Sequence, residues 1–216
     1  TFDLLDEAER LYRQAGETHL AGRVLIGRGL NEVENGMYSV ARSHLASGLD
    51  CLDPRRDPEL QMAAQHNLIL SLVEEGEFRE AGRLLLASGL REKREGSPLW
   101  LHRLRAIEGM IQAGLGNDKS AERAFEEART GFFENRQGLN AAHVSLELAV
   151  LWLRQGRYAD VTRVAREVYE KLFAAGVVLE AQRALSLLLR ACEEEIFSES
   201  MIDSVQDFLE QVERNP

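Results

Sequence analysis

The sequence has few of the residues that build β-sheets or disulfide frameworks. Its 216 residues include only 13 Val, 6 Ile and 4 Thr, and aromatic residues make up 6%. Because strands are enriched in β-branched and aromatic residues, a β-sandwich, a β-barrel and a Rossmann sheet are disfavoured. Two cysteines, Cys51 and Cys192, are too few for a disulfide framework in a chain of this length, which predicts a reducing, cytoplasmic location.

Long apolar runs and an excess of basic residues are also lacking. No run approaches the roughly 20 apolar residues that cross a bilayer, so we expect no membrane association. The chain holds 36 acidic and 26 basic residues, a formal net charge of −10. Nucleic-acid binding usually needs a basic patch, so this negative charge argues against a nucleic-acid partner.

Four residue types make up about half of the chain. There are 33 Leu, 27 Glu, 24 Ala and 23 Arg, and all four are good helix formers. A composition of this kind, combined with helical periodicity of the apolar residues, predicts an all-α fold.

A period of 40 residues runs through the sequence. Its clearest members are the glycines Gly36, Gly76, Gly116 and Gly156. Two positions after each glycine stand Tyr38, Phe78, Asp118 and Tyr158, and five positions after it stand Ala41, Ala81, Ala121 and Val161. A fixed period of this length is the sign of a repeat architecture, in which each repeat is one supersecondary unit.

Each repeat is predicted to form two helices. The first helix should begin near Thr18, Pro58, Pro98 or Gly138, run for about 17 residues and end at the repeated glycine, which can adopt the left-handed conformation. Asp57 and Ser97 are predicted N-caps.

Small residues predict close packing within each helix pair. Gly29, Gly109 and Ala149 stand at equivalent positions of the first helices, opposite the small residues early in the second helices. This pattern allows two helices to approach closely in an αα-hairpin. We expect the aromatic residue after the turn to fill the space between neighbouring hairpins.

Because one hairpin cannot bury its own apolar face, the repeats should stack into a solenoid. The period predicts one domain, 1–216, of about 11 helices, divided into 1–16, 17–56, 57–96, 97–136, 137–176 and 177–216. Segment 1–16 has the pattern of a second helix that lacks its first helix. We therefore expect a piece of a longer protein; the alternative is a native N-terminal capping helix.

The repeated positions resemble the tetratricopeptide repeat (TPR). That family has a small residue in the first helix, Gly-x-Tyr at the turn, and Ala early in the second helix. The matching residues here are Gly29, Gly36, Tyr38 and Ala41, then Gly76, Phe78, Ala81 and Pro98, then Gly156 and Tyr158. The usual period is 34 residues, so the chain is similar to the longer type found in kinesin light chain and MalT-like proteins. Asp118 departs from the pattern.

The resemblance implies a right-handed superhelical solenoid that binds a protein or peptide on its concave face. The first helices line this face, and the residues expected there are Arg23, His66, Asn67, Arg103, Met110, His143, Glu147 and Arg154. A carboxylate clamp of the family's best-known type is not expected, because Ile26, Leu30 and Ile107 occupy three of its five positions. The partner would be another protein, a peptide or an attached domain, and the arginines of the face suit an acidic one.

Sequence signals for catalysis, metals and cofactors are missing. The five histidines never stand three or four residues apart, so no zinc site is encoded locally. Gly27-Arg28-Gly29 lies within a predicted helix and does not fit a dinucleotide-binding loop. We therefore predict a non-enzymatic binding scaffold without catalytic residues, cofactor or metal. The alternative is a ligand- or peptide-sensing regulatory domain of a bacterial transcription or signalling protein.

Overall fold

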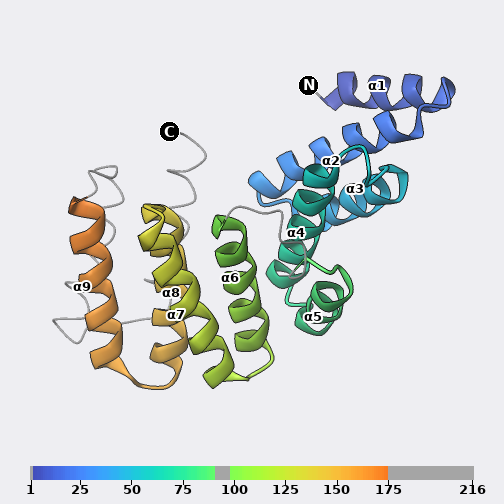
Figure 1. Ribbon diagram of the computed structural model, residues 1–216. Coiled ribbons are helices and arrows are strands. Elements are labelled where there is room, and N and C mark those ends of the chain that lie inside the picture. Colours follow the sequence, from blue (N-terminus) through green and yellow to red (C-terminus); the bar gives the residue numbers. More distant parts are fainter. Residues whose placement is uncertain (1, 91–97, 175–216) are drawn as a thin grey trace. The chain divides into compact units, whose positions relative to one another are not determined.

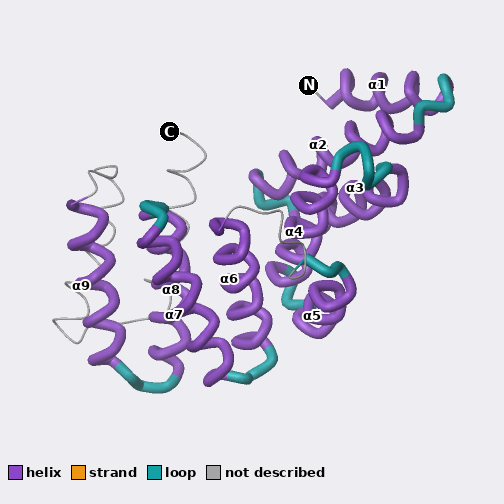
Figure 2. Tube along the Cα trace, in the orientation of Figure 1, coloured by secondary structure: helices purple, strands orange, loops and turns teal. Residues whose placement is uncertain are grey.

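The computed structural model describes residues 2–90 and 98–174. Within these ranges the chain is all-helical, with nine helices joined by short loops and no strand (Figure 1, Figure 2). The all-α prediction is confirmed for this part of the chain. The predicted repeat 177–216 and the predicted N-cap Ser97 lie outside the described residues, so the total of about 11 helices stays a prediction.

The chain divides into two compact units, Thr1–Lys93 and Arg94–Pro216, and each is described by itself. The helices of unit 1 are α1 (Phe2–Gln14), α2 (Thr18–Glu34), α3 (Tyr38–Cys51), α4 (Pro58–Glu74) and α5 (Phe78–Ala87). Those of unit 2 are α6 (Pro98–Gly114), α7 (Asp118–Glu134), α8 (Gly138–Arg154) and α9 (Tyr158–Ala174). The single-domain organisation stays a prediction.

Each helix packs against its neighbour in sequence within a unit, and the first helices of consecutive repeats also contact each other. These contacts join α2 to α4 in unit 1 and α6 to α8 in unit 2. The four first helices begin at the predicted residues, and each is 17 residues long. The packing is therefore that expected of a helical repeat.

The repeated glycines close the first helices as predicted. Gly36 has a φ of 71°, and the other three lie between 69° and 77°. The N–H of Gly36 donates to the carbonyl of Val33 at 2.9 Å, and the N–H of Met37 donates to that of Glu32 at 2.8 Å. These two bonds form a Schellman motif, which satisfies carbonyls that the end of a helix leaves unpaired. Arg136 adopts the same conformation after α7, with a φ of 58°.

The two helices of a hairpin approach most closely at a glycine. A Cβ on Gly29 would lie 2.7 Å from the Cγ of Leu45 and 3.2 Å from the carbonyl oxygen of Ala41. A Cβ on Gly109 would lie 2.5 Å from the Phe125 ring. The predicted role is confirmed for Gly29 and Gly109, because the absence of a Cβ allows these apolar side chains to lie directly against the first helix.

The structure contradicts two local predictions. Asp57 stands at the N-cap of α4 but makes no capping hydrogen bond with its side chain, because its carboxylate faces His19 and Arg23. Tyr158 does not fill a space between hairpins, since it is 61% exposed.

A stability measurement on two glycines of α2 tests the close approach. Gly29→Ala should destabilise the chain by about 1–3 kcal/mol, because the new methyl group overpacks against Leu45. Gly27→Ala is the matched control, since a Cβ there meets nothing within 4 Å and alanine favours the helix by up to about 1 kcal/mol. Urea unfolding of both variants should give changes of opposite sign; equal changes would contradict the packing described here.

Candidate functional site

The predicted binding residues lie on the first helices of both units. Arg103 and Met110 belong to α6, and His143, Glu147 and Arg154 belong to α8. The remaining three, Arg23 on α2 and His66 and Asn67 on α4, belong to unit 1. The structure therefore places five of the eight together in unit 2 and three in unit 1.

One face of α6 combines apolar and basic side chains. Residues 99, 103, 106, 110 and 113 follow a spacing of three and four residues, which keeps them on one side of a helix. Leu99, Ala106, Met110 and Ala113 are partly buried against the core of unit 2. Arg103, in the middle of this set, is exposed. Leu99, Ala106, Met110 and Ala113 thus form a partly buried apolar surface, called here the apolar floor, and Arg103 adds an exposed positive charge to it.

The adjoining helix α8 extends this face. His143 occupies the position equivalent to Arg103, and α6 and α8 contact each other. His143 and Glu147 are half-buried, and Arg154 is exposed in the last turn. Leu146 is fully buried in the same helix. The polar residues of α8 therefore flank the apolar floor of α6, whereas Leu146 belongs to the core.

In unit 1 the predicted residues are engaged with neighbouring groups. The Nε of Arg23 lies 3.5 Å from the Asp57 carboxylate. The side-chain amide of Asn67 donates to the carbonyl of Ala63 in its own helix at 2.9 Å. His66 is half-buried on α4. Arg23 is therefore paired although it is exposed, and Asn67 bonds within its own helix.

A buried histidine ties the connection between α3 and α4 to α2. The Nδ1 of His19 accepts the backbone N–H of Asp53 at 3.1 Å, and its Nε2 lies 3.0 Å from Asp57. Because Nδ1 accepts, a neutral ring carries its proton on Nε2, the atom that lies against the carboxylate. Both ring nitrogens are therefore occupied, so this His–Asp pair has a structural role.

A buried carboxylate was missed by the sequence reasoning. Glu32 is only 2% exposed; its Oε2 is hydrogen-bonded to the Nδ1 of His44 at 2.7 Å, and its Oε1 lies 3.4 Å from Arg28. Arg28 also pairs with Asp6 of α1. The repeat carried a signal, because two of the three equivalent positions hold Leu72 and Trp152, while the third holds the uncharged Gln112. A carboxylate in an apolar position needs a partner, and His44 also stands where other repeats have apolar residues.

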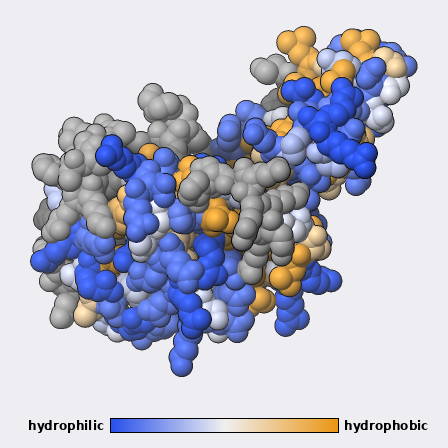
Figure 3. All heavy atoms as spheres, in the orientation of Figure 1, coloured by the Kyte–Doolittle hydropathy of each residue, from blue (hydrophilic) through white to orange (hydrophobic). Residues whose placement is uncertain are grey.

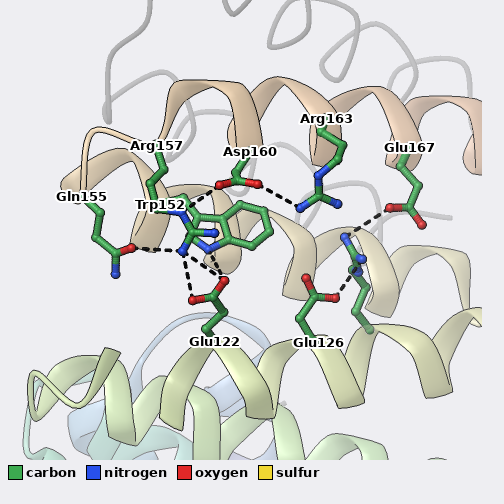
Figure 4. Close-up of polar contacts among 9 residues, drawn as sticks. Glu122, Glu126, Trp152, Gln155, Arg157, Asp160, Arg163 and Glu167 are labelled. Carbon is green, nitrogen blue, oxygen red and sulfur yellow. Dashed lines mark hydrogen bonds and ion pairs between the residues drawn. The ribbon is translucent and has the colours of Figure 1, made fainter. Parts of the chain in front are cut away.

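Unit 2 contains a larger polar network between α7, α8 and α9 (Figure 4). Glu122 accepts the indole N–H of Trp152 at 2.9 Å and two hydrogen bonds from Arg157 at 3.0 Å. Arg157 also donates to Asp160 at 2.7 Å. The guanidinium groups of Arg157 and Arg163 lie 5.0 and 5.3 Å from the centre of the Trp152 ring. The Trp152 ring therefore lies against two guanidinium cations, and each of them is also paired with a carboxylate.

These contacts shift ionisation in the expected directions. The hydrogen bond from Arg157 lowers the pKa of the Asp160 carboxyl, and a second bond from Arg163 acts in the same direction. The hydrogen bond to Glu122 raises the pKa of Arg157, and Asp160 adds to this effect. The neighbouring Arg129 is buried and pairs with Glu126 at 2.8 Å and with Glu167 at 3.3 Å. The network therefore joins α7, α8 and α9, while the buried Nε and Nη1 of Arg129 make no hydrogen bond.

In residues 2–90 and 98–174 no three His, Cys, Asp or Glu side chains come together as metal ligands. Over the same residues, no helix has the length and apolar character needed to cross a membrane.

Comparison with known proteins identified no relative. No family model, no curated protein and no solved structure matches the chain.

Replacing Glu32 and His44 by the residues of the next repeat should separate two contributions to stability. One is the cost of leaving His44 without its partner, and the other is the net contribution of the pair. Glu32→Leu alone should destabilise by about 1–3 kcal/mol, because His44 loses its buried partner. The double variant Glu32→Leu/His44→Leu, with the leucines found at 72 and 84, should return to within about 1 kcal/mol of the unchanged chain. Urea unfolding checks both values, and additive losses would contradict the coupling.

The lowered pKa of Asp160 predicts a pH-dependent contribution to stability. The contribution is fully present above the ordinary aspartate value of about 3.9 and is lost as pH falls from there through the lower pKa of the folded state. Asp160→Asn should therefore reduce the loss of stability between pH 6 and pH 3, measured by urea unfolding. Asp50→Asn, at an exposed residue of α3, is the control and should leave the acid loss unchanged.

Proposed function

We propose that the chain is a non-enzymatic, TPR-like scaffold that binds a peptide segment of another protein on its first helices. In this proposal the repeats stack into a right-handed solenoid, and α6 and α8 supply the main contacts. The observation that carries the proposal is the mixed face of unit 2. There, Ala106 and Met110 form a half-buried apolar floor beside the exposed Arg103.

Such a face suits an extended or helical peptide. Apolar side chains of the partner would cover Ala106 and Met110, and the hydrophobic effect would supply most of the affinity. Arg103 offers up to five N–H donors to a carboxylate, and His143 at the equivalent position of α8 offers another polar contact. The preferred partner is therefore a peptide that combines apolar residues with Asp or Glu.

The other polar clusters favour a binding role over catalysis, because their side chains are engaged with groups of the protein itself. An acid–base catalyst needs a group that can reach a substrate. His19, Glu32 and Glu122 are instead engaged with protein groups that hold helices together. The arginine of the α6 face is the polar group that stands exposed amid apolar side chains.

Selection from a phage-displayed peptide library tests the proposal. Peptides that combine apolar and acidic residues should be enriched on the chain. The double variant Arg103→Ala/His143→Ala should weaken a selected peptide by about tenfold or more, because a charge-assisted contact contributes about 1.5–3 kcal/mol. Isothermal titration calorimetry measures the change in Kd, and circular dichroism checks that the variant is folded.

The matched control is Arg123→Ala, which removes an exposed arginine from the second helix α7 of the same unit. It should leave the Kd unchanged. A library without enriched peptides, or peptides that bind the double variant as tightly as the unchanged chain, would contradict the proposal. The alternative sensing role would instead be favoured by a metabolite that raises the Tm in a thermal-shift screen while no peptide binds.

A further inference from the structure

Exposed apolar side chains lie at the hairpin turns of both units. In unit 1, Met37 and Val40 beside the turn between α2 and α3 are 40% and 48% exposed. In unit 2, Leu115 in the turn between α6 and α7 is 39% exposed, and Tyr158 at the start of α9 is 61% exposed. Stacked repeats bury apolar residues between their helices, so stacking does not account for apolar groups at the turns.

The two turns of each unit lie at the same end of its helices. In unit 1, Arg42 of α3 donates to the carboxylate of Glu75, which directly follows α4, at 2.8 Å. In unit 2, the side-chain amide of Gln155, which follows α8, donates to the Asp118 carboxylate at the start of α7 at 2.9 Å. Figure 1 shows both turns of unit 2 at the lower end of its helices. These ends are called here the turn edges, and they comprise residues 34–43 and 74–83 in unit 1 and residues 114–123 and 154–163 in unit 2.

The two turn edges carry opposite net charges. The turn edge of unit 1 holds five acidic and three basic residues, a net charge of −2, whereas that of unit 2 holds three acidic and five basic residues, a net charge of +2. Glu77 and Glu80 on the first edge are exposed, and their side chains make no hydrogen bond or ion pair within residues 2–90 and 98–174. The same holds for Lys119 and Arg123 on the second edge. In Figure 3 the end of unit 2 that carries its turns shows mainly hydrophilic side chains.

We propose that the turn edge of unit 1 binds the turn edge of unit 2 in a second copy of this chain. The opposite charges attract the two edges and orient them. The apolar residues of each edge, Met37 and Val40 on one and Leu115 and Tyr158 on the other, leave water in the contact. Each copy carries both edges, so two copies related by a two-fold axis form the contact twice and close a dimer.

A second copy matches each turn edge in length as well as in charge. Each edge consists of two hairpin turns that are one 40-residue repeat apart in the sequence, so the two edges present turns at the same spacing. A second copy also supplies apolar residues and the opposite charge on one surface. The proposal does not rest on peptide binding by α6 and α8, because the turn edges lie at the ends of the helices and the apolar floor lies along α6.

Sedimentation velocity of the 216-residue chain over a range of concentrations tests the proposal. The chain should self-associate reversibly in 0.1 M salt. The dissociation constant should rise at least tenfold in 1 M salt, because the screening length falls from about 10 Å to about 3 Å and the attraction between the edges is lost.

Two charge-reversal variants identify the contact. Glu77→Lys/Glu80→Lys makes both edges basic, and Lys119→Glu/Arg123→Glu makes both edges acidic. Each variant alone should associate at least tenfold more weakly than the unchanged chain, because edges of like charge then meet. An equimolar mixture of the two variants should associate as the unchanged chain does, since every contact again joins opposite charges. Both variants keep a negative total charge, so total charge does not favour the mixture.

The control Asp50→Lys/Glu134→Lys changes the total charge as much as Glu77→Lys/Glu80→Lys does, at exposed residues outside the turn edges. It should leave association unchanged. Arg103→Ala/His143→Ala should also leave it unchanged, which separates this contact from the peptide-binding face. Circular dichroism checks that each variant is folded.

Three outcomes would overturn the self-association proposal. The first is a chain that stays monomeric in 0.1 M salt up to about 1 mM, the upper end of the concentrations at which weak complexes form. The second is association of either charge-reversal variant that is as tight as that of the unchanged chain. The third is a mixture of the two variants that stays monomeric.

Discussion

The structure depends on the close approach of two helices at a position without a side chain. Gly29 brings α2 against Leu45, and Gly109 brings α6 against Phe125. Because glycine has no side chain, a large apolar side chain of the second helix lies directly on the backbone of the first helix. Both helices then gain dispersion contacts. The Schellman turn at Gly36 and its equivalents then sets the short connection that keeps the two helices antiparallel.

The polar networks of the two units lie between packed helices, at positions where the residue type differs from one repeat to the next. In unit 1, Glu32 and His44 replace apolar residues at two facing positions and meet each other. In unit 2, Trp152 fills the position of Glu32, and Glu122 and Arg157 satisfy its indole N–H and cover its ring. These repeats thus keep the same backbone arrangement with a different internal chemistry, and the α6 face proposed for binding lies outside these networks.

The proposed binding surface follows from the way in which repeats bury apolar residues. A repeat buries its apolar residues only against neighbours, so surfaces along the first helices keep apolar groups partly accessible. On α6 this leaves Ala106 and Met110 half-buried beside Arg103. A surface that combines apolar groups with a charge suits a peptide.

The sequence by itself determined the helices, their boundaries and the glycine turns, because these depend on local periodicity and on the φ that glycine allows. It also predicted the close helix approach, since a small residue stands at the same place in three of the four first helices, with Ile69 as the exception. Only the tertiary structure decided the partners of charged side chains. The Asp57 carboxylate lies against His19 instead of capping α4, and Glu32 pairs with His44, which is 12 residues away in the sequence. These pairings depend on the distances between helices, and the order of residues in the sequence does not specify those distances.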